Sequence, residues 1–261
     1  MTRIPTVMSI AGSDSGGGAG IQADLKTIAA NGAYGTTAVT AITAQNTIGV
    51  NDIKEMPVDL VESQIDAVIK DIGVDAAKTG MLSSVEMVLC VSRKIKEYSI
   101  QKFVLDPVMV STSGDSLLRE DAVDSIKKFL MPLCMVITPN GPEAEKLTGI
   151  KVVDLDSARD ASIELVRMGA SAAVVKGGHL KGPATDVLYD GKEFRMFTTK
   201  RIDSQNTHGT GCTFASAIAT GLAFNRSLRD SVSLAKAYVT GGIRNGLSLG
   251  SGNGPLNHFH Q

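Results

Sequence analysis

The chain has 261 residues, of which 43% are hydrophobic, and its formal net charge at pH 7 is -1. Because nucleic-acid-binding proteins present a basic field to phosphate, the near-neutral charge and the lack of Lys/Arg runs exclude a nucleic-acid partner. The N-terminal residues read neither as a signal peptide nor as a membrane span, so we expect a cytoplasmic protein with no membrane partner.

Short apolar runs alternate with longer helical patterns along the chain. In order, we expect a strand at 6–10, a helix at 21–30, a strand at 36–47, a helix at 58–72, a strand at 76–79, a helix at 83–98, a strand at 102–105, a helix at 119–130, a strand at 134–138, helices at 142–147 and 156–168, a strand at 172–176, a hairpin of 185–189 with 193–198, and helices at 211–222 and 228–246. This alternation predicts an α/β fold with a mostly parallel central sheet flanked by helices, in a single domain over 1–261.

Polar residues stand at the ends of the predicted strands. They are Asp14, Gln45, Lys78, Asp106, Asn140 and Lys176. In open α/β sheets, ligands bind outside the carboxyl ends of the strands. We therefore expect these six side chains to converge on one rim.

The segment 206–213, Asn-Thr-His-Gly-Thr-Gly-Cys-Thr, is the most informative motif. A glycine-rich turn that begins a helix presents free N–H groups and the positive end of the helix dipole, which together form an anion site. Cys212 near the first helical turn is expected to have a lowered pKa and to face the bound anion. A nucleophile or base beside a phosphate site favours phosphoryl transfer. The alternative is a tight helix start with a small buried thiol.

The glycine-rich loop at 12–20 also follows a strand and begins a helix. It does not match the G-x-G-x-x-G dinucleotide pattern, and no Walker loop exists in the chain, so we expect backbone that approaches a small flat ligand, or simply a turn. Asp24, placed on the first turn of the next helix, either binds a hydroxyl or favours the helix N-terminus. The carboxamide of Gln45 matches the donor–acceptor edge of an aminopyrimidine, or is a surface group.

Asn140 and Glu143 stand three residues apart at a helix start and so face one side. They can hold Mg²⁺ through water, or form a capping box, and the two roles are compatible. Asp106 can order the metal or the phosphate, and Lys176 can neutralise transferring phosphate charge, although a strand-end lysine is often only solvated.

Several other residues have simpler interpretations. Cys90 and Cys134 are expected to be buried structural thiols, and the odd number of separated cysteines fits a reducing cytosol. His258 and His260 form an H-x-H pair that we interpret as a surface tail rather than a zinc site. The small polar segment at 108–116 is long enough to act as a lid.

Several blocks together resemble the hydroxymethylpyrimidine/phosphomethylpyrimidine kinases of thiamine biosynthesis. They lie at 11–24, 44–47, 78–82, 105–109, 138–140, 175–179, 207–213 and 254–260, in order along essentially the whole chain. The resemblance implies a ribokinase-like three-layer α/β sandwich, usually a homodimer. It also implies two ATP-dependent steps at one site, in which the pyrimidine alcohol and then its monophosphate are phosphorylated.

The resemblance also assigns roles to residues. The anion hole would be formed by Gly209, Thr210, Gly211 and Cys212. The pyrimidine would contact Gln45, Ala19, Met81 and Val108. Magnesium would be supported by Asn140 and Glu143 with Asp106 nearby, and Lys176 would contact the ATP phosphates. Most sugar kinases of this fold have an aspartate base where this chain has Cys212, so the proton acceptor stays open between the Cys212 thiolate, Asp24 and the phosphate.

Three other functions are considered. A pyridoxal kinase of the same fold is the nearest alternative, but some of those relatives have a lid cysteine, whereas this chain has Ser111, Thr112 and Ser113. A nicotinamide oxidoreductase is disfavoured by the mismatch of the glycine pattern. A non-catalytic sensor of small molecules would release no ADP from ATP.

Overall fold

The computed structural model describes residues 3–110, 114, 117 and 119–260. Within them the strands form one sheet of nine, in the order β3-β2-β1-β4-β5-β6-β7-β8-β9. The strands are β1 (Thr6–Asp14), β2 (Tyr34–Gln45), β3 (Val50–Glu55), β4 (Ala76–Thr79), β5 (Phe103–Leu105), β6 (Val136–Ile137), β7 (Ala173–Val175), β8 (Ala184–Tyr189) and β9 (Phe194–Thr199). The pairs from β2 to β7 are parallel, whereas β3, β8 and β9 pair antiparallel at the two edges.

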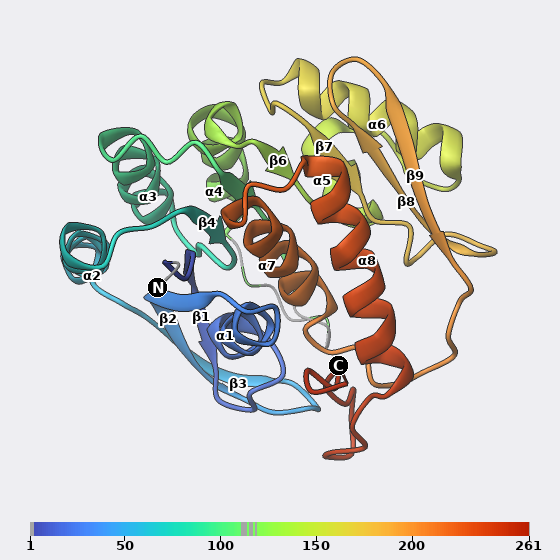
Figure 1. Cartoon of the computed structure of the whole chain (residues 1–261), viewed down its shortest axis with the longest axis horizontal. Helices are drawn as coiled ribbons and strands as arrows, with labels where there is room; N and C mark the ends of the chain where they lie inside the picture. The colour runs from blue at the N-terminus through green and yellow to red at the C-terminus, as the bar shows by residue number, and fades with distance from the viewer. Residues whose placement is uncertain (1–2, 111–113, 115–116, 118, 261) are drawn as a thin grey trace.

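Helices cover both faces of this sheet (Figure 1). They are α1 (Gly20–Ala30), α2 (Val58–Asp71), α3 (Val85–Glu97), α4 (Glu120–Ser125), α5 (Gly141–Thr148), α6 (Leu155–Arg167), α7 (Thr210–Ala223) and α8 (Leu228–Arg244). One core joins the sheet to α2 through α6, and a second core joins it to α1, α7 and α8. The predicted three-layer α/β sandwich with a mostly parallel sheet is confirmed.

The central strands bury apolar side chains on both faces. In β5, Phe103 and Leu105 pack in the core on the α2–α6 side, and Val104 between them packs in the core on the α7 side. Successive side chains of a strand point to opposite faces, so a strand covered by helices on both sides must be apolar throughout. This burial on both faces explains why the central strands appear in the sequence as short, uninterrupted apolar runs.

Some elements differ from the sequence-based prediction. The edge strand β3 was not predicted, because its residues are mostly polar and exposed. The helix predicted at 119–130 is α4 followed by a π-helical turn at Ile126–Leu130. His258 is buried rather than part of a surface tail, because Tyr238 packs against it and donates a hydrogen bond to its carbonyl (3.0 Å). Among the described residues, no helix combines the length and apolarity needed to cross a bilayer.

Both predicted structural thiols, Cys90 and Cys134, are buried as expected. Most of the lid predicted at 108–116, including Ser111, Thr112 and Ser113, lies outside the described residues. The argument against a pyridoxal kinase that uses those three side chains therefore stays a prediction.

Candidate active site

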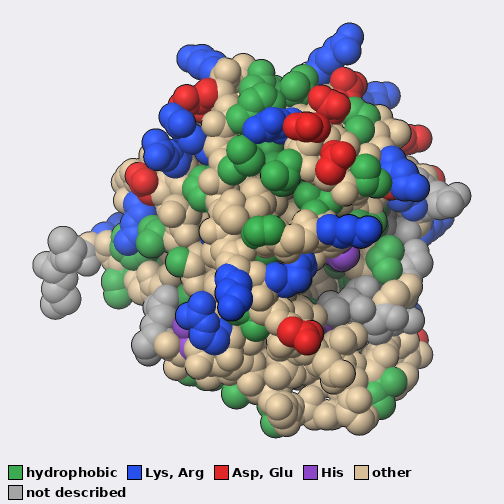
Figure 2. All heavy atoms as spheres, turned by 90° about the vertical axis from the view of Figure 1, so that its right-hand side faces the viewer, with side chains coloured by type: hydrophobic (Ala, Val, Ile, Leu, Met, Phe, Trp, Pro, Cys, Tyr) green, Lys and Arg blue, Asp and Glu red, His purple; other side chains and the backbone are tan. Residues whose placement is uncertain are grey.

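The carboxyl ends of the parallel strands lie at one cavity of about 620 Å³. Five of the six strand-end residues line it: Asp14, Gln45, Asp106, Asn140 and Lys176. The sixth, Lys78, is fully buried and is not part of the lining. The face shown in Figure 2 is hollowed near its middle, and Lys and Arg side chains lie beside the hollow. The convergence expected for an open α/β sheet is therefore seen for all but Lys78.

Helix α7 begins at this cavity. Its N-cap, Gly209, has a φ of 80°, and a Cβ there would lie 1.8 Å from the carbonyl oxygen of Gly18, so the position requires glycine. In the part of the chain that the structure describes, the N–H groups of Gly211 and Cys212 have no hydrogen-bond partner. These are donors that a helix start leaves unsatisfied, and the helix dipole adds positive potential at the same point. The geometry can hold an anion.

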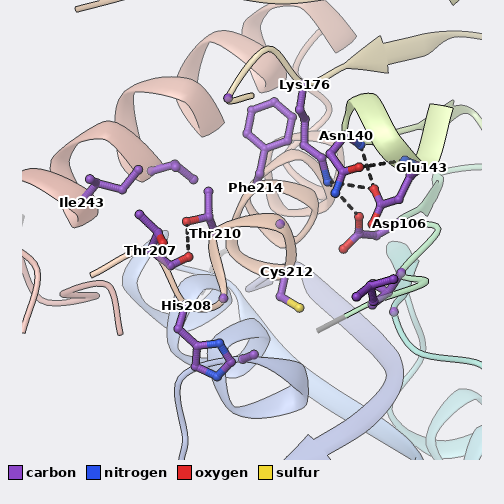
Figure 3. Close-up of a pocket in the computed structure, with 18 of the residues that line it drawn as sticks. Asp106, Asn140, Glu143, Lys176, Thr207, His208, Thr210, Cys212, Phe214 and Ile243 are labelled. Atoms are coloured by element: carbon purple, nitrogen blue, oxygen red, sulfur yellow. Dashed lines mark hydrogen bonds and ion pairs between the residues drawn. The ribbon is translucent and has the colours of Figure 1, made fainter. Parts of the chain in front are cut away.

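Thr210 uses its polar groups within the turn. Its N–H and its hydroxyl both donate to the carbonyl oxygen of Thr207, at 3.2 and 2.6 Å (Figure 3). In this conformation Thr210 closes the turn rather than offering a free donor, which differs from the role that the family resemblance implies for it.

Opposite the start of α7 lies a cluster of charged side chains (Figure 3). The ammonium of Lys176 lies 3.3 Å from Oδ1 of Asp106 and 3.8 Å from Oε2 of Glu143. A Cβ on Gly211 would lie 3.3 Å from the Lys176 ammonium and 3.8 Å from Oδ2 of Asp106. The free amides of α7 and this lysine therefore converge on one small volume.

Asn140 and Glu143 form the capping box of α5. The Asn140 side chain accepts from the Glu143 N–H (2.8 Å), and Oε2 of Glu143 accepts from the Asn140 N–H (2.7 Å). The box fixes both side chains at the cavity wall, so the predicted capping role is confirmed, and their role toward a ligand stays a prediction. Asp106 leaves one buried oxygen, Oδ2, without a partner among the described residues.

Burial and neighbouring charges alter the ionisation of this cluster. Burial raises the pKa of Glu143 to about 7, with a further rise from the Asp106 charge that Lys176 opposes. Burial alone would lower the pKa of Lys176, but Asp106 and Glu143 outweigh it and the pKa is raised. Lys176 is therefore a permanent cation in the cavity, whereas Glu143 titrates close to neutral pH.

The expected low pKa of Cys212 is wrong for the ligand-free cavity. Cys212 is the third residue of α7, as the motif predicted, and lines the cavity. Burial raises its pKa to about 12, and the buried Lys78 ammonium offsets this only in part. The sequence-based expectation considered the helix start alone, whereas poor hydration of the thiol outweighs that effect. Cys212 is a neutral thiol at rest.

Asp24 does not face the cavity, so its predicted contact with a substrate hydroxyl is wrong. Helix α1 begins at Gly20, which places Asp24 in the second turn. Its carboxylate is fully buried, lies 3.0 Å from the Lys78 ammonium, and accepts hydrogen bonds from Ser9 (2.5 Å) and Ser216 (2.7 Å). Asp24 and Lys78 satisfy each other between β4, α1 and α7. This structural ion pair removes Asp24 from the candidate proton acceptors.

Part of the cavity lining is apolar. Ala19, Met81 and Val108 line it with the carboxamide of Gln45. A Cβ on Gly12 would lie 3.2 Å from the sulfur of Met81, so the missing side chain lets Met81 pack closely against the backbone of the glycine-rich loop. All four residues that the resemblance assigned to the ring are thus brought together.

The rest of the lining contains residues that the sequence did not indicate. Lys236 forms an ion pair with Asp186 at 2.9 Å, and Asp186 also accepts from the N–H of Gly177 (2.9 Å). The guanidinium of Arg201 donates to three carbonyl oxygens of the loop after β7, those of Gly178, Leu180 and Gly182. These contacts join segments far apart in sequence, so no local pattern indicates them.

The chain is similar to known proteins over nearly its whole length. A family model described as phosphomethylpyrimidine kinase matches residues 14–257. The hydroxymethylpyrimidine/phosphomethylpyrimidine kinase of Bacillus subtilis is 46% identical over 97% of this chain and 94% of its own. The thiamine biosynthesis bifunctional protein ThiED of Geobacter sulfurreducens is 51% identical over 97% of this chain, which spans only 52% of that protein.

Solved structures show the same fold. An ADP complex of Bacillus subtilis pyridoxal kinase superposes with a TM-score of 0.92 at 36% identity, covering 98% of both chains. A phosphomethylpyrimidine kinase from Clostridium difficile superposes with a TM-score of 0.81 at 42% identity, covering 91% of this chain and 98% of the other.

The fold and the site together define a ribokinase-like small-molecule kinase. A helix start with free amides faces a lysine and carboxylates at the carboxyl ends of a parallel sheet, in a cavity whose lining is partly apolar. The chain belongs to the phosphomethylpyrimidine kinase family.

Proposed function

We propose that the chain uses ATP to phosphorylate 4-amino-5-hydroxymethyl-2-methylpyrimidine and then converts the monophosphate to the diphosphate, in thiamine biosynthesis. The observation that carries the proposal is the geometry around Gly211. The two free amides lie close to the Lys176 ammonium, which would be 3.3 Å from a Cβ on Gly211, and these groups share one cavity with the Gln45 carboxamide. The names of relatives 43–51% identical to this chain support the choice of substrate.

In this proposal the cavity positions charge rather than supplying covalent chemistry. The alcohol oxygen attacks the γ-phosphorus, the bond to the β-phosphate oxygen breaks, and ADP leaves. The amides of Gly211 and Cys212 and the ammonium of Lys176 stabilise the negative charge on the transferring group, which is the main catalytic contribution in phosphoryl transfer. Removal of such donors costs about 10²–10³ in rate.

The alcohol proton needs an acceptor. Asp24 is buried away from the cavity, and the thiol form of Cys212 does not accept a proton. The transferring phosphate can accept the proton without help from an ionised side chain. Cys212 can accept it only if bound substrates lower the pKa of its thiol. Of the three proton acceptors considered from the sequence, the phosphate and Cys212 therefore stay in the proposal.

The residues present fit Mg²⁺. Asp106 has a buried carboxylate oxygen without a partner in the described part of the chain, and Glu143 and Asn140 lie beside it. Mg²⁺ prefers such oxygen ligands and keeps several waters. We propose that Asp106 and Glu143 hold it through water, where it would neutralise charge on the ATP phosphates.

At the ring end, Gln45 would read the amino and ring-nitrogen edge of the pyrimidine. Ala19, Met81 and Val108 would pack on its faces. Lys236 and the loop held by Arg201 would lie near the nucleotide at the opposite end. We further propose that 1–261 is a single domain, that the protein is a homodimer, and that it is cytoplasmic, since its three cysteines are free.

A pyridoxal kinase is the second candidate. It is supported by structural neighbours named as pyridoxal kinases from Bacillus subtilis and Staphylococcus aureus, which are 35–36% identical to this chain. A coupled ADP-release assay with the hydroxymethylpyrimidine, its monophosphate and pyridoxal tests both. We expect the two pyrimidines to give the highest kcat/KM. A higher value with pyridoxal would favour the second candidate, and no ADP release with any of them would contradict both.

A further inference from the structure

Asp14 organises the glycine-rich loop between β1 and α1. Its Oδ1 accepts a hydrogen bond from the N–H of Gly16 (2.8 Å), and its Oδ2 accepts from those of Gly18 (3.1 Å) and Ala19 (2.8 Å). Burial alone would raise the pKa of Asp14, but the hydrogen bonds from His208 and the loop outweigh it and lower the pKa. The loop is therefore folded around an ionised carboxylate.

The same carboxylate binds a residue 194 positions later in the chain. Nε2 of His208 lies 2.8 Å from Oδ2 of Asp14, and both side chains are buried. Because an ionised carboxylate can only accept, Nε2 carries the proton and donates. The backbone N–H of His208 donates to the carbonyl oxygen of Gly254 (3.0 Å), so the main chain and the side chain of His208 are each held by a hydrogen bond.

The two segments joined by this hydrogen bond are in direct contact. A Cβ on Gly18 would lie 2.4 Å from Cδ2 of His208, and a Cβ on Gly209 would lie 1.8 Å from the carbonyl oxygen of Gly18. Both distances are far below any real Cβ contact. The approach is possible only because both positions are glycine, which connects the two glycine-rich motifs of the sequence to one contact.

The contact joins two segments that line the cavity. On one side, Ala19 follows the loop amides held by Asp14 and lines the ring end. On the other side, His208 directly precedes the start of α7, with the free amides of Gly211 and Cys212 (Figure 3). The distance from a bound ring to these amides is therefore set by how the loop sits against α7.

We propose that His208 is a positioning residue for phosphoryl transfer. Its hydrogen bond to Asp14 holds the glycine-rich loop against the start of α7, and so fixes the acceptor alcohol relative to the transferring group. This inference rests on the proposed function, because it takes the Ala19 end of the cavity as the ring site. A displacement of about 1 Å is enough to cost about 10²-fold in rate, so this single contact matters for turnover.

The test compares three variants of the full chain. His208→Ala removes the donor, and His208→Gln places an amide nitrogen near the position of Nε2. His258→Ala is the matched control, because it removes a buried imidazole that lies outside the cavity lining. For each we would measure kcat and KM in the ADP-release assay, ADP affinity by calorimetry, melting temperature, and amide hydrogen exchange of residues 16–19 by mass spectrometry.

We expect His208→Ala to lower kcat by about 10²-fold with ADP affinity unchanged, because the amides and Lys176 remain. His208→Gln should recover most of this loss, and His258→Ala should lower only the melting temperature. The proposal is overturned if His208→Ala turns over like the wild type, if glutamine is no better than alanine, or if His258→Ala loses as much activity.

The exchange measurement separates this inference from the proposed function. If the wild type phosphorylates none of the pyrimidines, the proposed function fails, but the loop contact is still tested. Faster exchange at residues 16–19 in His208→Ala and not in His208→Gln supports the contact. Unchanged exchange in His208→Ala overturns it.

Discussion

A methyl group added at Gly211 tests the anion site with little effect on the fold. Gly211 is the second residue of α7, and its φ lies outside the left-handed range, so alanine causes no backbone strain there. Alanine lowers the backbone entropy of the unfolded chain, so Gly211→Ala should leave the free energy of unfolding unchanged or raise it by up to about 1 kcal/mol.

The same methyl occupies the proposed phosphoryl position. It would lie 3.3 Å from the Lys176 ammonium and 3.8 Å from Oδ2 of Asp106. Loss of contact to one set of oxyanion donors costs about 10²–10³ in rate, equivalent to about 3–4 kcal/mol in the barrier. We therefore expect kcat to fall by about 10²–10³ while the KM for the pyrimidine changes little, since the ring end is untouched.

The assay is coupled ADP release, with a melting curve of each variant. Gly141→Ala is the matched control, because it adds a methyl to the first turn of α5 at an ordinary contact distance of 3.7 Å from Val152. A stable Gly211→Ala protein with wild-type kcat would refute the placement of the transferring group between α7 and Lys176.

Three further predictions concern the ionisable side chains of the site and of the core beside it. Asp24→Asn should lower the free energy of unfolding, measured with denaturant, by about 3–5 kcal/mol, because it leaves Lys78 buried without its counter-charge. The KM for the pyrimidine should not change. A raised KM at unchanged stability would show that Asp24 contacts the ligand. If bound substrates lower the pKa of Cys212 enough for it to accept the alcohol proton, Cys212→Ala should lower kcat by about 10²–10⁴ with little effect on pyrimidine affinity measured by calorimetry. Wild-type turnover of this variant would reduce Cys212 to a packing role and leave the transferring phosphate as the proton acceptor. Because burial raises the pKa of Glu143 to about 7, the carboxylate is protonated below that pH, so the apparent Mg²⁺ affinity of the wild type should weaken from pH 8 to pH 6. Glu143→Gln should flatten this dependence, and an equally steep dependence in that variant would point to another group.

The sequence predicted those parts of the site that depend on local patterns. The capping box of Asn140 and Glu143 needs only their spacing, and the start of α7 needs only the glycines around Thr210. The strand ends could be placed because buried parallel strands are uniformly apolar and end at turn residues. Strand β3 was not predicted because an exposed edge strand lacks that apolar signal.

Contacts between distant segments could not be predicted from the sequence. The pairing of Asp14 with His208 joins positions 194 residues apart, and nothing in either motif indicates the other. Asp24 was misassigned because its partner Lys78 lies 54 residues away and its burial has no local signature. For Cys212, the helix start is a local feature that lowers the pKa, whereas the burial that raises it comes from tertiary packing.

The central claim is that the amides of Gly211 and Cys212 hold the transferring phosphoryl group while the pyrimidine lies beside Gln45. A crystal structure with ADP, Mg²⁺, aluminium fluoride and the hydroxymethylpyrimidine measures this directly. We predict the fluoride at about 2.7–3.1 Å from both amide nitrogens, with the hydroxymethyl oxygen on its opposite side from ADP. A fluoride held elsewhere, or a pyrimidine bound away from Gln45, would contradict the claim.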